Sequence, residues 1–598
     1  MAVTISFADK FTFSVTLQHS FFLVTSFLVY FLTRYYLTSF SYPIKSIHPT
    51  PPSVSTSKTP SSAPSIKNKD KSKIDCYSPS TNTYLGSVSV LPPSSVEPLA
   101  ALASSAQSSW ATTSFEERRQ VLRTIQHYIT SNTELICKVC CQDSGKTMLD
   151  ALMGEVLTTC EKISWLNGSG EEALKKSYRK VNMMMLHKTA YVEYVPLGVL
   201  GVIAPWNYPF CNLMNHILSG LFSGNAVLVK VSEHTSWSAP FFMEIVKSAL
   251  VAHNHSPDVV QLVTGFGDTG AAMVTAPSVD KIIFTGSPAV GRMVMAGAAP
   301  TLKPVVLELG GKDPMIFVDD VELDKVIPWA MRGCFQNCGQ NCCGVERVFV
   351  YESVHSEFVS RVVKEVQALR QGATCFSDSD SINSIDCGAM VMKEQLAIVQ
   401  SLVDDAVSQG AKILVGGSPN TSCGDGNFYQ PTVLTGVKAG MRIWTEEVFG
   451  PVMCIIQVDG DSDDVCVRMV NDCPFGLGSS CYSGNQKRAE SIGSRLRSGM
   501  FTANDFGVNY LIQSLPFGGV NESGFDRFAG EEGLRGCCLM RSVVVDRIPG
   551  VKTSIPPAFS YPVDGVRAMG FGDGLINMFY SNSVFGKLKA IWKIIKNA

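Results

Sequence analysis

GCFQNCGQNCCG, residues 333–344, places Cys334, Cys338, Cys342 and Cys343 within twelve positions. Their spacing is compatible with zinc ligands, but no His-x-x-x-His partner occurs elsewhere in the chain. A disulfide is also compatible with the spacing. The third interpretation is one nucleophilic thiol among inert, buried neighbours, which requires further catalytic groups in the chain.

Length and composition restrict the class of protein. With 598 residues, the chain is long enough for two or three domains. A formal net charge of −2 gives no general attraction to nucleic acid. The 19 cysteines are an odd number and are widely scattered, which favours free thiols in a reducing compartment.

The amino-terminal region predicts a membrane anchor over residues 1–37. Residues 11–33 contain no Asp, Glu, Lys or Arg and are long enough to span a bilayer as a helix. Residues 38–75 are rich in Ser, Pro and Lys and predict a disordered linker. The positive charges that follow the span place the long carboxy-terminal part on the cytosolic side, at the endoplasmic reticulum or another endomembrane. A cleaved signal peptide or a plastid transit peptide is the alternative.

The core, residues 76–546, alternates helical stretches with short β-branched runs. Residues 114–131 show apolar residues at helical spacing. Strand-like, glycine-punctuated runs are LGVLGVIAP, NAVLVKV, VVQLVTG, KIIFTG and AKILVGG. Such alternation predicts an α/β fold with a doubly wound parallel sheet.

The carboxy-terminal extension, residues 547–598, ends in a predicted basic amphipathic helix. One face carries five apolar residues: Phe585, Leu588, Ile591, Trp592 and Ile595. Lysines lie largely on the other face: Lys587, Lys589, Lys593 and Lys596. A helix of this kind can lie in a membrane interface, and the alternative is a helix packed on the protein's own surface.

Six further motifs accompany the cysteine stretch in a fixed order. They are VIAPWNYPF (202–210), VLVKVSEH (227–234), IIFTGSPAVG (282–291), VVLELGGKDP (305–314), EEVFGPV (446–452) and PFGGVNESG (516–524). With them, residues 76–546 resemble the NAD(P)-dependent aldehyde dehydrogenase superfamily. The two extensions make the chain most similar to the plant family-22 aldehyde dehydrogenases.

This resemblance implies three catalytic residues. The family motif F-x-N-x-G-Q-x-C aligns with residues 335–342 and makes Cys342 the nucleophile. The side-chain amide of Asn207, with the backbone N–H of Cys342, would stabilise the oxyanion, and Glu308 would be the general base. Asn341, before the nucleophile, departs from the residues common in relatives, and the resemblance places it on the substrate side.

The resemblance also implies an NAD site; no metal site is predicted, because the cysteine stretch has no second set of ligands. Adenosine-ribose contacts fall on Lys230 and Glu233, and the acidic residue favours NAD over NADP. The phosphate side falls on Gly286, Ser287 and Gly291, at a helix start. The nicotinamide side falls on Trp206, Glu447 and Phe449. GFGDTG (265–270) also matches G-x-G-x-x-G, and we interpret it as a neighbouring turn.

The implied architecture has a Rossmann-type NAD-binding domain at 76–310, interrupted near 178–196 by an oligomerisation hairpin. A catalytic α/β domain at 311–515 follows, and residues 516–546 return to the core and supply an oligomerisation strand. A homodimer or homotetramer is expected. The predicted activity is NAD-dependent oxidation of an aldehyde to a carboxylic acid, and a membrane location suggests hydrophobic, lipid-derived aldehydes. A CoA-acylating semialdehyde dehydrogenase and a catalytically silent, membrane-tethered scaffold are the alternatives.

Overall fold

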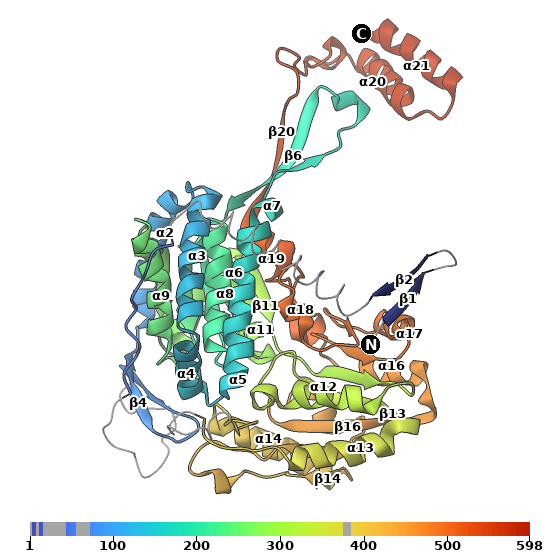
Figure 1. Cartoon of the computed structure of the whole chain (residues 1–598). Helices are drawn as coiled ribbons and strands as arrows, with labels where there is room; N and C mark the ends of the chain where they lie inside the picture. The colour runs from blue at the N-terminus through green and yellow to red at the C-terminus, as the bar shows by residue number, and fades with distance from the viewer. Residues whose placement is uncertain (1–2, 8–10, 16–43, 55–71, 375–383) are drawn as a thin grey trace. The chain divides into compact units, whose positions relative to one another are not determined.

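The computed structural model describes residues 3–7, 11–15, 44–54, 72–374 and 384–598 (Figure 1). Contacts divide the chain into two compact units. The larger unit comprises Met1–Glu171 and Leu197–Cys537, and the smaller comprises Glu172–Pro196 and Cys538–Ala598. The hairpin region and the strand predicted for oligomerisation therefore belong to the same unit, together with the carboxy-terminal extension.

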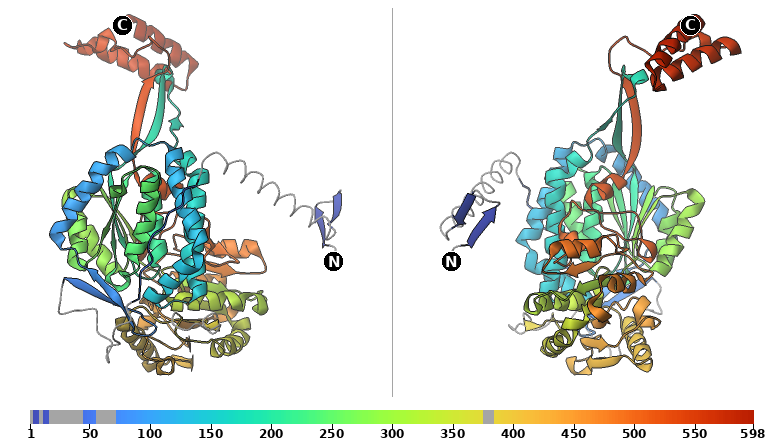
Figure 2. Two further views of the ribbon diagram at one scale, coloured as in Figure 1. Left: turned by 60° about the vertical axis from the view of Figure 1, so that its left-hand side comes forward. Right: turned by 90° about the vertical axis from the view of Figure 1, so that its right-hand side faces the viewer.

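The first sheet of the larger unit has the order β19-β11-β10-β7-β8-β9, and its strands are parallel except for β19. Helices cover both faces (Figure 2). The predicted doubly wound parallel sheet is confirmed here. Its strands are β7 (Val199–Ala204), β8 (Ala226–Val231), β9 (Val260–Val263), β10 (Lys281–Thr285), β11 (Val305–Glu308) and β19 (Gly524–Phe525). The helices are α8 (Pro209–Phe222) and α9 (Ala239–Ala252) on one face, and α2 (Val96–Trp110), α10 (Gly267–Thr275) and α11 (Pro288–Ala298) on the other.

The second sheet of the larger unit has the order β14-β15-β16-β13-β12-β17-β18. It is parallel except for β14, the edge strand formed by the run AKILVGG, so this predicted strand lies in a different sheet from the other four. Its strands are β12 (Asp313–Phe317), β13 (Val345–Tyr351), β14 (Lys412–Val415), β15 (Thr432–Thr435), β16 (Val452–Val458), β17 (Ser480–Tyr482) and β18 (Thr502–Ala503). Every residue of the central strands β12 and β13 is buried, as expected when both faces of a sheet are covered.

Helix α8 is buried along its length, and its terminal polar groups therefore need partners from the protein. At its start, the Glu155 carboxylate accepts from the N–H groups of Phe210 and Cys211 at 3.1 and 2.8 Å. At its end, the Arg118 guanidinium donates to the Phe222 carbonyl at 3.0 Å. A negative charge at the start and a positive charge at the end both complement the helix dipole. Arg118 belongs to α3 (Phe115–Ser131), which confirms the helix predicted for residues 114–131. Ser114 begins this helix with a capping box.

The smaller unit is a three-stranded antiparallel sheet with a helical hairpin. β20 (Cys538–Asp546) pairs along its whole length with β6 (Lys188–Pro196), and β5 (Ser177–Arg179) pairs with the other edge of β6. Helices α20 (Gly565–Tyr580) and α21 (Val584–Asn597) then pack closely, because Gly574 leaves room for the backbone at Ala590. The predicted carboxy-terminal helix is thus present as α21.

The amino terminus departs from the prediction of a single apolar helix. Phe11–Val15 (β2) is a strand that pairs antiparallel with Val3–Phe7 (β1). Both segments alternate apolar and polar residues, which is the period of a strand, whereas the prediction rested on the absence of charge. The rest of the predicted anchor and most of the linker lie outside the described residues. Within the described residues, no helix is both long and apolar enough to cross a bilayer.

The caps of α8 lead to a stability prediction. Arg118→Met removes a buried cation and leaves the Phe222 and Ala111 carbonyls without their donor. We expect the free energy of unfolding to fall by about 2–3 kcal/mol. Arg123→Met, on the same helix, is the matched control, since its partner Glu116 is partly solvated; its cost should stay below about 1 kcal/mol. Denaturant unfolding measures both, and equal losses would contradict the role assigned to Arg118.

Candidate active site

The cysteine stretch begins in the last turn of α12 (Leu323–Phe335) and continues as the loop that leads to β13. Asn337, Cys338 and Gly339 all have positive φ, so the chain turns sharply after the helix. At Gly339 a side chain is excluded, because a Cβ would lie 2.1 Å from the Gly450 carbonyl oxygen. Gln340 then holds the loop by accepting from the Val391 N–H at 2.9 Å and donating to the Asn337 carbonyl at 3.1 Å.

The four cysteines of this stretch occupy different environments. Cys334 and Cys338 are buried, whereas Cys342 and Cys343 are partly exposed, and all four are free thiols. In the part of the chain that the structure describes, no group of His, Cys, Asp and Glu could hold a metal ion. Cys342 and Cys343 are therefore the two thiols of the loop that a substrate could reach.

Glu308 lies at the end of β11 and is 1% exposed. Its pKa is raised to about 7, because burial disfavours the carboxylate more than its hydrogen bonds to the Cys342 thiol and the Gly310 backbone favour it. The Oε1 atom of Glu308 has no hydrogen-bond partner among the described residues. The pKa of Cys342 is well above its usual range, through its hydrogen bond with Cys343, burial and the nearby Glu308. A thiol and a buried carboxyl group that titrates near neutrality thus lie within hydrogen-bonding reach.

Asn207 lies beside the cysteine loop, two residues before α8 begins. Its amide Nδ2 donates to the Gln340 carbonyl at 3.2 Å, and its Oδ1 accepts from Asn212 at 3.1 Å. The bond from Asn212 therefore fixes which end of the Asn207 amide faces the loop. Nδ2 carries two hydrogens, and the contact with Gln340 uses one of them. The structure brings the predicted residues Asn207, Glu308 and Cys342 to one place.

A buried ion pair fixes the backbone of Asn207. Lys146 contacts Glu155 at 2.6 Å, and both side chains are fully buried. Lys146 also donates to the Asn207 carbonyl at 2.8 Å, while Glu155 accepts from the start of α8. Sequence analysis missed this pair. The sequence does show a Lys and a Glu nine residues apart, separated by mostly apolar residues. That pattern alone does not show that the two side chains form an ion pair.

The predicted adenosine-side residues lie together at the end of β8. Lys230 Nζ is 3.5 Å from Glu233 Oε2, and burial lowers the pKa of Lys230. A Cβ added to Gly270 in the GFGDTG turn would meet the Lys230 side chain, so this turn packs against Lys230. A partly exposed carboxylate beside a lysine at the end of a parallel strand suits the hydroxyl groups of a ribose.

The predicted phosphate-side residues lie at the start of α11. Ser287 caps the helix through Val290 N at 3.4 Å. The N–H groups of Gly286 and Gly291 already donate to the carbonyls of Glu308 and Ser287. Gly291 allows close packing on Leu309, since a Cβ there would lie 2.4 Å from the end of the Leu309 side chain. A helix start next to the Glu308 strand fits a phosphate group, but neither glycine N–H is spare, and the site itself stays a prediction.

The predicted nicotinamide-side residues cluster near Glu308. The rings of Trp206 and Phe449 meet edge to face, 5.3 Å apart. Glu447 accepts from the Gly311 N–H at 3.0 Å, and burial together with the Glu346 carboxylate holds its pKa well above the usual range. Glu346, paired with buried Lys312 at 2.7 Å, accepts from the N–H groups that follow Glu447. Taken with the adenosine side, the groups present fit a dinucleotide.

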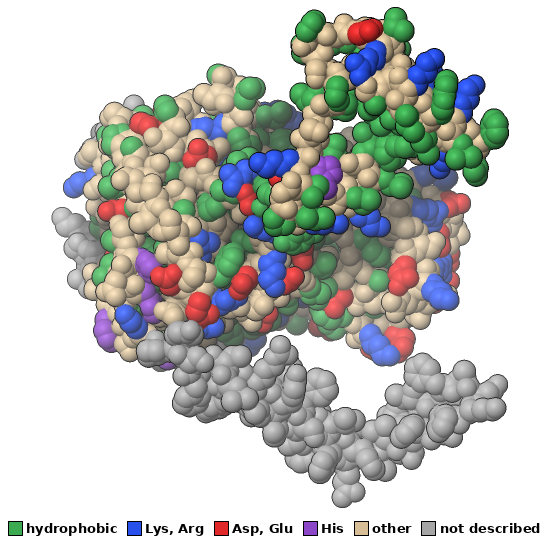
Figure 3. All heavy atoms as spheres, turned by 90° about the horizontal axis from the view of Figure 1, so that it is seen from above, with side chains coloured by type: hydrophobic (Ala, Val, Ile, Leu, Met, Phe, Trp, Pro, Cys, Tyr) green, Lys and Arg blue, Asp and Glu red, His purple; other side chains and the backbone are tan. Residues whose placement is uncertain are grey.

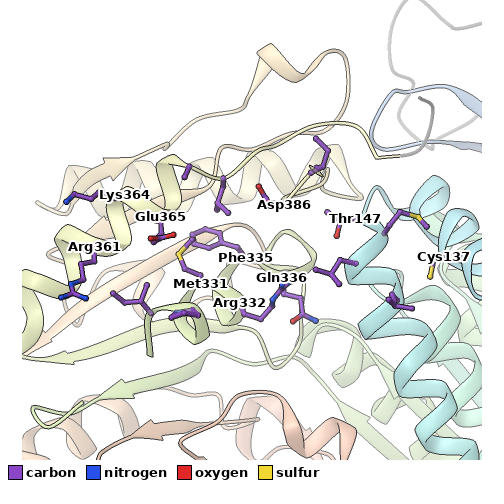
Figure 4. Close-up of a pocket in the computed structure, with 18 of the residues that line it drawn as sticks. Cys137, Thr147, Met331, Arg332, Phe335, Gln336, Arg361, Lys364, Glu365 and Asp386 are labelled. Atoms are coloured by element: carbon purple, nitrogen blue, oxygen red, sulfur yellow. The ribbon is translucent and has the colours of Figure 1, made fainter. Parts of the chain in front are cut away.

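One large pocket lies away from the three predicted catalytic residues, none of which lines it. It has a volume of about 1130 Å³ and lies against α12 and α13 (Glu352–Gln367). Figure 4 shows Met331, Phe335 and Gln336 within it, at the end of the helix that leads to the cysteine loop. Asn341, for which the substrate side was predicted, is buried, with its amide bonded to the Gln336 carbonyl and to the Tyr208 hydroxyl. Its place relative to a substrate stays a prediction.

Comparisons with known proteins agree with this geometry. A profile of the aldehyde dehydrogenase family matches residues 66–543. An aldehyde dehydrogenase-like protein of Saccharomyces cerevisiae is 40% identical over 539 residues, covering 88% of this chain and 83% of that protein. A peroxisomal aminoaldehyde dehydrogenase of Pisum sativum is 33% identical, covering 77% and 90%. The crystal structure of succinate-semialdehyde dehydrogenase from Burkholderia pseudomallei has a TM-score of 0.73 at 29% identity, covering 79% and 94%.

The raised pKa of Glu308 predicts a pH-dependent cost in stability. The folded protein keeps this proton up to about pH 7, whereas an unfolded Glu releases it near pH 4, so Glu308 destabilises the fold increasingly as pH rises between these values. Glu308→Gln should therefore gain about 2–3 kcal/mol relative to the unsubstituted protein between pH 5 and pH 8. Thermal unfolding without added dinucleotide measures this gain. A difference that is the same at both pH values would contradict the raised pKa.

Proposed function

Since the chain belongs to the aldehyde dehydrogenase family, we propose that it oxidises an aldehyde to a carboxylic acid through a covalent intermediate on Cys342. The observation that carries this proposal is the position of the Cys342 thiol, which is hydrogen-bonded to Glu308 and lies two residues from the Asn207 contact. Glu308 takes the thiol proton, and the thiolate attacks the carbonyl carbon. The developing oxyanion accepts from the Asn207 amide and the Cys342 N–H.

Two further events complete the reaction. A hydride leaves the substrate carbon, and the thiohemiacetal becomes a thioester on Cys342. Once Glu308 has released the thiol proton to solvent, its carboxylate accepts a proton from water and the hydroxide attacks the thioester carbon. The C–S bond then breaks, the acid departs, and the Cys342 thiolate takes a proton back from Glu308. The unpartnered Oε1 of Glu308 supports this second role, because it offers an acceptor that no side chain occupies.

NAD is the proposed hydride acceptor. Lys230 and Glu233 would hold its ribose, the start of α11 at Ser287 its phosphates, and Trp206, Glu447 and Phe449 its nicotinamide half. A 2′-phosphate would meet the Glu233 carboxylate, which favours NAD over NADP. The dinucleotide supplies the chemistry of hydride acceptance, and the protein supplies its orientation against the substrate carbon.

Finer features of identity belong to the same proposal. The amino- and carboxy-terminal extensions support a place among the plant family-22 enzymes. β20, an edge strand with exposed apolar residues, supports a homodimer or homotetramer. The names of the relatives specify aminoaldehydes and succinate semialdehyde, which differ in charge, so neither substrate transfers directly to this chain.

Substitutions separate the proposed steps. Cys342→Ala should abolish NADH production from a panel of aldehydes, while Cys343→Ala, the adjacent thiol, keeps measurable turnover. Asn207→Ala should lower kcat by about 10²–10³-fold. Glu308→Gln should release at most one equivalent of NADH per site and then stall, because the thioester is not hydrolysed.

Three outcomes of the same assays would contradict the proposal. Unchanged turnover by Cys342→Ala would refute the nucleophile. Strict dependence of product formation on CoA would favour the acylating alternative. Absence of NADH production from every aldehyde, by a folded protein, would favour the silent scaffold.

Membrane attachment is a second proposal, with two parts. The uncharged amino-terminal segment supports an anchor in an endomembrane, with the catalytic part cytosolic; secretion and plastid import remain the alternatives. In the helical hairpin at the carboxy terminus, Figure 3 shows hydrophobic side chains beside Lys and Arg. Phe585, Leu588 and Trp592 of α21 are 61–81% exposed, and the lysines between them would meet anionic lipid headgroups.

A carbonate wash of membranes tests attachment. The full chain should stay with the membrane, because a spanning segment resists alkaline extraction; full release would contradict the anchor.

Phe585→Ser with Trp592→Ser should reduce flotation with vesicles containing phosphatidylserine by several-fold, since it removes apolar area from the exposed face of α21. Val566→Ser with Met569→Ser on α20 is the matched control. Equal flotation of the α21 variant and the unsubstituted chain would contradict the proposed role of α21.

A further inference from the structure

One stripe of α8 differs from the rest of that helix. Every residue of α8 except Asn212 is buried. Tyr208, Cys211, Asn212 and Asn215 are spaced i, i+3, i+4 and i+7, so they share one face. All four side chains carry a polar atom, although most other inward positions of α8 are apolar.

This stripe faces the cysteine loop. The Tyr208 hydroxyl is bonded to the Asn341 amide, directly before Cys342. Asn212 donates to the Asn207 amide oxygen at 3.1 Å. The partial exposure of Asn212 in an otherwise buried helix therefore marks the side of α8 that is open next to the proposed oxyanion donor.

Tyr510 continues this stripe toward the proposed nucleophile, and we call the stripe together with Tyr510 the polar wall. It belongs to α18 (Val508–Leu511) and, like Cys342 and Cys343, packs against the apolar cluster around Phe517; Tyr510 and Cys343 also line one small cavity. Its hydroxyl accepts from the Asn215 amide at 2.8 Å and lies 3.2 Å from the Cys211 sulfur. The wall thus runs from Cys342 through Tyr510 to Asn215, where the Oγ1 of Thr158 also approaches Cys211 at 3.1 Å.

The wall has one unsatisfied group. Asn215 is 4% exposed, and its Oδ1 has no hydrogen-bond partner among the described residues, although its Nδ2 is fully engaged with Tyr510 and Cys211. A buried, unpaired amide oxygen is unfavourable, because it has lost its hydrogen bonds to water without gaining others. A ligand that supplies an O–H or N–H donor would remove this cost, whereas an alkyl chain would retain it.

We propose that the substrates are aldehydes whose chain carries a hydroxyl or amino hydrogen-bond donor, and that Asn215 determines this specificity. The inference rests on the proposed function, since the wall borders the substrate route only if Cys342 is the nucleophile. It replaces the expectation of hydrophobic, lipid-derived aldehydes, which came from the membrane hypothesis. A site built around an unpaired acceptor discriminates against an analogue that lacks the donor more strongly than an apolar site discriminates between chain lengths.

Matched pairs of aldehydes test the proposal. 3-Hydroxypropanal is compared with butanal, and 6-hydroxyhexanal with heptanal, so that each pair exchanges a hydroxyl for a methyl group at two depths. For at least one pair, kcat/KM should favour the hydroxyaldehyde by ten-fold or more. Asn215→Leu should reverse the preference, and the conservative Asn215→Ser, which keeps an acceptor, should retain part of it.

The control and the contrary outcomes follow from the same assays. Asn167→Leu is the control, because it removes another unpartnered amide oxygen in a segment distant in sequence from Asn215. It should leave the ratio of kcat/KM between hydroxyaldehyde and alkyl aldehyde unchanged. If Asn215→Leu does not fold, the ratio for Asn215→Ser decides. Preference for the alkyl aldehyde in both pairs, or an unchanged ratio in the folded Asn215 variants, overturns the inference while the proposed function stands. Oxidation of none of the aldehydes by the unsubstituted enzyme overturns the proposed function itself.

Discussion

The ion pair between Lys146 and Glu155 is the constraint on which the geometry of the site depends. A helix buried along its length cannot leave its first N–H groups without acceptors, and Glu155 satisfies two of them. The buried carboxylate in turn needs a cation, which Lys146 supplies. Lys146 also donates a hydrogen bond to the backbone carbonyl of Asn207. The requirement for satisfied polar groups at a helix start therefore fixes the backbone of Asn207, whose side-chain amide contacts the Gln340 carbonyl of the cysteine loop.

Much of the fold follows from local sequence patterns. Alternating β-branched runs and amphipathic stretches indicate a doubly wound sheet, and Ser114 with Glu117 marks the start of α3. The candidate nucleophile, base and oxyanion donor were predicted because each belongs to a distinctive motif. Their convergence could not be derived from periodicity, since Asn207, Glu308 and Cys342 come from three separate segments and meet only through tertiary packing.

The features that escaped prediction are of a different physical kind. Lys146 and Glu155 are ordinary charged residues in the sequence, and their meaning arises only from complete burial. The orphan oxygen of Asn215 depends on which neighbours its amide finds in three dimensions. At the amino terminus, absence of charge was given more weight than the alternation in Phe11–Val15, and the structure follows the alternation.

The strand that carries Glu308 has neighbours from distant parts of the chain. β11 lies between β10, which precedes it closely, and β19, where Gly524 pairs with Glu308. Ribosomal synthesis therefore delivers the base more than two hundred residues before the strand that completes its surroundings. A nascent chain can assemble the five parallel strands early. The catalytic site is complete only after β19, near the end of the larger unit, has been synthesised. An incompletely translated product would therefore contain the folded sheet without a complete catalytic site.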